Sequence, residues 1–203
     1  MLATNVKKQI QLSSVPKNNN HILKISFSED ELGTAYRITA VLLVHGFDIL
    51  EATAETMDDG HVRDVFLIRN LQNKQLNDSM LASIKHDLDT LFFGDMSVME
   101  YIKSHSIDVK KSLTDKKTET QVRLYNPEGS DNTVMDIIAK DRKGLLFQVT
   151  QILFLFGIDI ISFKAETSEG TVCDSFLLQR EKGGRLDTES TIPRLEAALK
   201  PLL

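Results

Sequence analysis

The apolar and polar positions of this chain trace one pattern of elements twice. Short apolar runs with β-branched residues at 21–27 and 133–139 predict buried strands. A turn with Asp and Gly follows each run. Apolar residues at helical spacing then predict helices over about 34–45 and 145–156. Each half of the chain therefore opens with a strand, a turn and a helix.

After these helices, both halves predict a strand, a hairpin turn, a second strand and a second helix. Gly46 and Gly157 stand where the end of a helix favours a left-handed residue. In the first half the strand is predicted over 47–56, the turn over 58–60 and the helix over about 78–93, and in the second half over 158–167, 168–170 and about 190–202. The second strand of each half is predicted to end near Ile68 and Leu178.

The two halves are copies of one unit. Writing Gly33 over Gly144 aligns a second pair of glycines thirteen residues later, and superposes an Ala-Glu-Thr triplet at Ala54 on one at Ala165. We therefore expect two units, 1–103 and 121–203, joined by a polar, Lys-rich linker at 104–120, with a short extra helix over about 95–103.

The β-α-β-β-α unit lacks the last strand of a ferredoxin-like fold. Residues 9–13 and 121–125 alternate between polar and apolar, and each is followed by a predicted loop containing Pro16 or Pro127. We expect these leading strands to take the missing place. The predicted fold class is α+β: two ferredoxin-like, βαββαβ-type repeats with antiparallel sheets, the edge strand of each supplied from its N-terminal side.

Composition narrows the function classes. The chain has 24 Lys and Arg against 29 Asp and Glu, a formal charge of −5, which argues against nucleic acid as a partner. Its single cysteine excludes an internal disulfide and favours a reducing compartment. The first residues lack the apolar core of a leader peptide, and no run reaches the roughly 18 apolar residues of a membrane helix. We expect a cytoplasmic protein with no membrane partner.

Three segments of the second copy resemble an ACT domain: Asp-Arg-Lys-Gly-Leu-Leu at 141–146, Gly-Ile-Asp-Ile-Ile-Ser at 157–162 and Val-Cys-Asp-Ser-Phe at 172–176. The layout of the whole chain is similar to the C-terminal ACT pair of PII protein uridylyltransferases. Two departures are the Glu-Leu-Gly-Thr turn at 31–34 and Lys143 at a position where the family usually has Pro. The resemblance implies tandem regulatory domains.

ACT domains that this chain resembles bind an amino acid. The turn and strand starts of this sequence have groups that could hold the two charged ends of such a ligand. A helix start offers unpaired N–H groups and partial positive charge to a carboxylate, and a preceding glycine permits close approach. A carboxylate at the start of the next strand could accept from the ligand ammonium group. Simpler roles are helix capping or turn bracing by the turn aspartates and backbone hydrogen bonding by the strand-start aspartates. The candidate ligand-binding residues are Asp141, Gly144, Leu145, Asp159, Asp30, Gly33 and Asp48.

The first helix of each copy carries a second apolar face. At about 100° per residue, Phe147 and Phe154 lie together away from the core stripe, and Tyr36 and Leu43 do the same in the first copy. Matched aromatic and aliphatic pairs at equivalent positions predict an interface, either between the repeats or between chains.

Signatures of catalysis are absent from the sequence. The five histidines have no metal-ligand spacing, Cys173 has no suggested histidine partner, and His86-Asp87 is interpreted as a surface pair on a helix. No phosphate-binding glycine loop occurs. We therefore predict no catalytic residue, no metal, no cofactor and no enzyme activity of the chain itself.

Three functions remain open. The first is a sensor that binds an amino acid effector, with glutamine a candidate by resemblance, and signals to a partner protein or acts as a homodimer. The second is a ligand-free interaction adaptor, resembling the glycine cleavage repressor and favoured by the altered turn at 31–34. The third is the detached regulatory part of a uridylyltransferase.

Overall fold

The computed structural model describes residues 9–28, 31–56, 62–71, 76–107 and 120–203. The first half contains β1 (Ile10–Lys17), β2 (Asn20–Phe27), α1 (Thr34–Val44), β3 (Phe47–Thr56), β4 (Val62–Asn70), α2 (Asp78–Phe93) and α3 (Val98–Ser104). The second half contains β5 (Gln121–Tyr125), β6 (Thr133–Lys140), α4 (Leu145–Leu155), β7 (Ile158–Ser168), β8 (Thr171–Arg180) and α5 (Thr191–Leu199).

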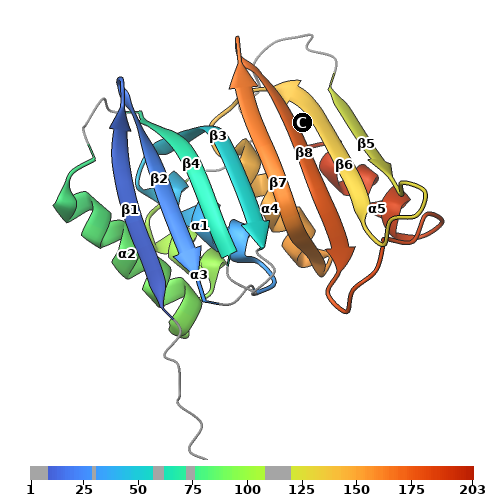
Figure 1. Cartoon of the computed structure of the whole chain (residues 1–203), viewed down its shortest axis with the longest axis horizontal. Coiled ribbons are helices and arrows are strands. Elements are labelled where there is room, and N and C mark those ends of the chain that lie inside the picture. Colours follow the sequence, from blue (N-terminus) through green and yellow to red (C-terminus); the bar gives the residue numbers. More distant parts are fainter. Residues whose placement is uncertain (1–8, 29–30, 57–61, 72–75, 108–119) are drawn as a thin grey trace, which may run out of the picture.

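All these strands form one antiparallel sheet in the order β1-β2-β4-β3-β7-β8-β6-β5. The helices lie together on one face of the sheet (Figure 1). Each half contributes four adjacent strands, so the sheet is two ferredoxin-like repeats joined edge to edge. The predicted α+β fold class is confirmed. Among the described helices, none is long and apolar enough to cross a membrane.

The leading strands form the outer edges of the sheet, as predicted: β1 pairs with β2, and β5 pairs with β6. The predicted loop at Pro16 is wrong, because β1 continues through this residue to Lys17. A tight turn at 18–19, with Asn18 at φ 55°, then leads directly into β2. An edge strand tolerates proline, since one of its sides needs no backbone donors. Most of the predicted linker at 104–120 lies outside the described residues.

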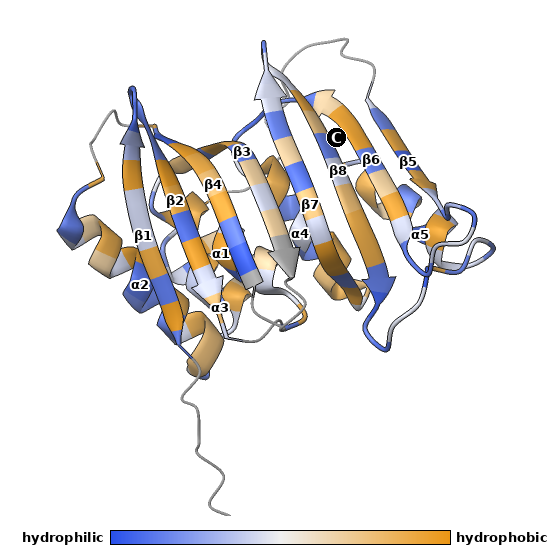
Figure 2. Cartoon of the chain, in the orientation of Figure 1, coloured by the Kyte–Doolittle hydropathy of each residue, from blue (hydrophilic) through white to orange (hydrophobic). Residues whose placement is uncertain are grey.

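Apolar and polar residues alternate along the strands (Figure 2). In β2, Leu23, Ile25 and Phe27 are buried against the helices, whereas Lys24 is exposed. The helix ends also follow prediction, since Gly46 and Gly157 adopt left-handed φ values of 74° and 64°. The core therefore lies between one face of the sheet and the helix layer.

The two repeats meet where β3 pairs antiparallel with β7. In this register Thr53 lies opposite Lys164, its own counterpart in the other repeat. The same 111-residue offset relates Thr39 on α1 to Thr150 on α4, whose hydroxyl oxygens are 3.0 Å apart. Residues that face their own counterparts mark an approximate twofold axis, which therefore runs through the sheet and between the two helices.

The second apolar faces of α1 and α4 pack against each other across this axis. The Tyr36 ring stacks on Phe147, with centroids 5.4 Å apart, and on Phe154, with centroids 5.2 Å apart. Such pairs contribute about 0.5–1.5 kcal/mol each beyond the area that they bury. The predicted interface is confirmed as a contact between repeats within one chain.

Candidate functional site

Two cavities lie at the junction of the repeats, at equivalent positions about the twofold axis. The residues that matter in the first, called here the Gly144 cavity, are Asp48, Asp141, Arg142, Gly144, Leu145 and Asp174. Those in the second, called here the Gly33 cavity, are Glu31, Gly33, Asp64, Phe154 and Asp159.

The turn before α4 forms one wall of the Gly144 cavity. Gly144 has a left-handed φ of 76°, and the Leu145 N–H donates to the Arg142 carbonyl at 3.1 Å. The Asp141 N–H donates to the Gly170 carbonyl at 2.8 Å, which ties the turn to the β7–β8 hairpin. Among the described residues, no side chain caps α4. The first amides of this helix are therefore suited to an anion.

Asp141 does not cap α4, one of the simpler roles predicted for it. Its carboxylate accepts from the backbone N–H of Arg142 and so braces the turn, the other simple role. Burial raises the pKa of Asp141, and the negative charge of Asp48 raises it further. The two carboxylates therefore act on one another, even though they come from different repeats.

Asp48 enters the Gly144 cavity from the start of β3 in the first repeat. Its Oδ2 lies 2.5 Å from an Nη2 nitrogen of Arg69 on β4. Asp48 therefore pairs with an arginine side chain and also lines the cavity. The cavity thus combines a strand start from one repeat with a helix start from the other.

Two residues that line the Gly144 cavity were not among the predicted ones: Asp174 and Arg142. Asp174 on β8 is 5% exposed, and burial raises its pKa to about 7, with Asp141 adding to the rise. The Arg142 guanidinium donates to Gln148 and, at 2.6 Å, to the Leu202 carbonyl, and burial lowers its pKa. Asp174 could have been found, since the repeat alignment places it on Asp64, and a carboxylate recurring in an apolar strand is unusual.

Two more predicted residues, Gly33 and Asp159, line the Gly33 cavity. Gly33 starts α1 with φ 86°, and Asp159 comes from the start of β7 in the other repeat. Asp159 Oδ2 accepts from the Gln179 amide at 3.5 Å. Gly144 and Asp159, which we expected to hold one ligand together, therefore line different cavities. Asp30 lies outside the described residues.

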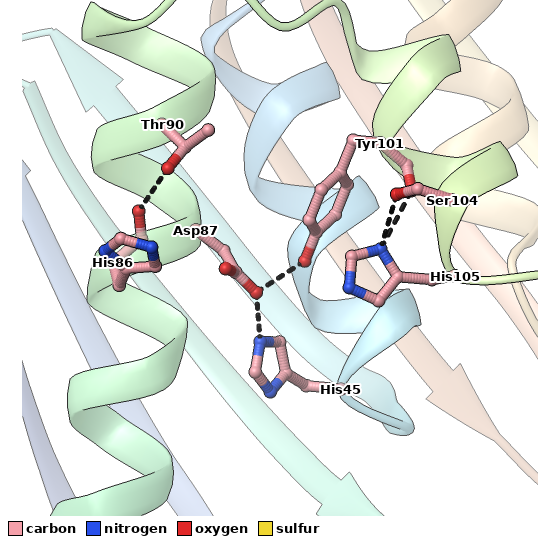
Figure 3. A network of polar contacts seen from close by, with 7 residues as sticks. All are labelled: His45, His86, Asp87, Thr90, Tyr101, Ser104 and His105. Carbon is pink, nitrogen blue, oxygen red and sulfur yellow. Dashed lines mark hydrogen bonds and ion pairs between the residues drawn. The ribbon is translucent and has the colours of Figure 1, made fainter.

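A polar cluster outside both cavities joins three helices (Figure 3). Asp87 Oδ2 on α2 lies 2.8 Å from His45 Nε2 and accepts from the Tyr101 hydroxyl at 2.8 Å. Burial raises the pKa of Tyr101, and its bond to Asp87 adds to the rise. Of the two residues predicted to form a surface pair, only His86 is exposed. Asp87 is partly buried and holds His45, the residue at the C-terminal end of α1, three residues before Asp48.

This cluster is not arranged as a metal site. Across the part of the chain that the structure describes, no three His, Cys, Asp or Glu side chains come together as metal ligands. Two donors converge on one carboxylate oxygen, an arrangement that holds side chains in place.

No known protein family profile matches the chain. It is similar to bifunctional uridylyltransferase/uridylyl-removing enzymes. It is 27% identical to that of Cereibacter sphaeroides over 172 residues, which cover 84% of this chain and 18% of the enzyme. It is 22% identical to that of Rhodospirillum rubrum over 174 residues, 85% of this chain and 19% of the enzyme. The chain therefore spans about a fifth of the length of these relatives.

Among solved structures, an aspartate kinase from Synechocystis matches 89% of this chain with 26% of its own length, at 16% identity and a TM-score of 0.42. The sequence similarities confirm the resemblance to uridylyltransferases that the repeats had indicated. The chain is thus similar to a limited part of much longer enzymes.

Proposed function

We propose that this chain is a regulatory protein that binds an amino acid in the Gly144 cavity and signals its presence to a partner protein. The observation that carries the proposal is the meeting of two kinds of group in one cavity. The start of α4 and Arg142 can donate to a carboxylate, and Asp48 can accept from an ammonium group. An α-amino acid carries both.

The relatives support a regulatory role. The matched part is about a fifth of each uridylyltransferase/uridylyl-removing enzyme. The chain's resemblance to ACT domains favours effector binding over catalysis, and makes glutamine the first candidate effector. We further propose that the regulated partner is a protein of nitrogen metabolism, a uridylyltransferase being one candidate.

A specific surface favours the adaptor as a second candidate function. Leu155 on α4 is 67% exposed and Met99 on α3 is 43% exposed. Gln151, one turn before Leu155, donates to Met99 Sδ at 3.0 Å, so the two apolar side chains lie near each other. Capture of a stoichiometric partner in amino-acid-free medium, lost in Leu155→Asp, would favour the adaptor over the sensor.

A thermal-shift titration with the twenty amino acids tests the sensor. At 100 times Kd, a bound ligand stabilises the folded chain by about 2.7 kcal/mol, which raises Tm by roughly 5–10 °C for a chain of this size. Arg142→Gln should weaken binding roughly 10- to 100-fold, because it removes a charge-assisted donor.

The matched control is Arg123→Gln, an exposed arginine on β5 whose guanidinium lies over the Tyr125 ring. This variant should bind the same amino acid as well as the wild-type protein does. If none of the twenty amino acids changes Tm at millimolar concentration, the sensor function is wrong.

A further inference from the structure

The Gly144 and Gly33 cavities are built from equivalent positions of the two repeats. Asp48 and Asp159 supply the strand start in each, and Asp174 and Asp64 supply the buried carboxylate. An amino-acid site that followed this symmetry would be present twice in the chain. One position breaks the equivalence at the place that a ligand carboxylate would take.

The difference is the side chain over the glycine. Leu43 lines the Gly144 cavity, whereas its counterpart Phe154 lines the Gly33 cavity. The Phe154 ring lies so close to Gly33 that a Cβ atom on residue 33 would come within 2.6 Å of ring Cδ2. Stacking on Tyr36 holds the ring there. The cavity volume is about 20 Å³ beside Gly33 and about 40 Å³ beside Gly144.

Charge does not distinguish the two cavities. Arg142 lines the Gly144 cavity and donates to the Leu202 carbonyl at 2.6 Å. Arg37 lies beside Gly33, where its Nη1 would be 3.5 Å from a Cβ atom on residue 33, and it donates to the Leu32 carbonyl at 3.0 Å. Each helix start thus has one arginine that already donates to a backbone carbonyl.

We infer that the chain binds one amino acid, in the Gly144 cavity, and that Phe154 closes the equivalent Gly33 cavity. The inference rests on the proposed function. The Phe154 ring occupies the space against the backbone at Gly33 that a ligand carboxylate would need. Specificity for one site thus lies in one exchanged pair, Leu43 with Phe154.

Isothermal titration calorimetry on the full chain tests the inference, with L-glutamine as the first probe and each of the other nineteen amino acids in turn. The wild-type protein should bind one molecule per chain. Leu43→Phe copies the closed cavity into the open one and should weaken binding at least tenfold. Phe154→Leu copies the open cavity into the closed one and should raise the stoichiometry to two.

The matched control is Phe156→Leu, the same exchange at the C-terminal end of α4, where the ring instead faces Arg194. Its stoichiometry should stay at one. Two molecules bound per wild-type chain would overturn the inference while leaving the sensor function intact. A single site that survives Leu43→Phe would also overturn it. If no amino acid binds the wild-type chain, the sensor function itself fails and the inference fails with it.

Discussion

Replacing Asp174 with Asn is expected to remove much of a pH-dependent loss of stability that the wild-type protein shows between about pH 4 and pH 7. The pKa of this carboxyl rises from 3.8 to about 7, first because it is buried and then because Asp141 lies near. In that pH range the folded protein holds a proton that the unfolded chain releases. Stability is therefore full below about pH 4 and falls as the pH rises through about 7.

The expected size of this loss is roughly 4 kcal/mol, the free-energy equivalent of a shift of about three pKa units. Asparagine keeps the shape of the side chain and an oxygen that can accept from the Glu166 backbone N–H, as the carboxylate does. It has no proton to release. The variant should therefore match the wild-type protein at pH 4 and exceed its free energy of unfolding at pH 8.

Urea unfolding followed at several pH values measures this difference. Asp131→Asn is the control, because Asp131 is exposed just before β6 and its replacement should leave the pH profile unchanged. If Asp174→Asn shows the same decline in stability as the wild-type protein, burial of Asp174 is not the cause of that decline.

Replacing Gly33 with Ala is expected to lower the free energy of unfolding by roughly 2–5 kcal/mol. A left-handed φ of 86° accounts for about 1–2 kcal/mol of this cost, and the contact of the new Cβ atom with Phe154 accounts for about 1–3 kcal/mol. Gly46→Ala separates the two causes. It has a similar φ of 74° and nothing within 4 Å of the added atom, so only the first cost applies.

A double-variant cycle tests whether the Phe154 ring causes the difference. Phe154→Leu shortens the side chain over Gly33, so the cost of Gly33→Ala in that background should fall toward the cost of Gly46→Ala. Equal losses for Gly33→Ala and Gly46→Ala in the wild-type protein would contradict the close contact that the structure shows.

Most elements of this fold could be predicted from local patterns. The bounds of β3, β5 and α2 agree with the sequence prediction, because alternating or helically spaced apolar residues mark each of them clearly. The loop predicted at Pro16 was wrong, because proline usually ends a strand but is tolerated in an edge strand. Whether a strand lies at the edge depends on its pairing with distant strands, which the local pattern does not contain.

The site was predicted only in part, because it too depends on contacts between segments that are distant in the sequence. The glycine turns and the strand-start aspartates were found by repetition, but the repeat does not tell which turn meets which strand. That depends on β3 pairing with β7 and on α1 packing against α4, both contacts between distant segments. Arg142 was missed because a single charged residue in a turn carries no periodic signal.

Because β3 pairs with β7 of the same chain, the two cavities at this junction belong to one covalent chain. Two identical single repeats that associated about the same axis would form two identical cavities, and every substitution would alter both. In the tandem chain, a substitution at residue 142 leaves residue 31 unchanged. Covalent linkage thus lets one half of a symmetric pair lose a site while the other half keeps it.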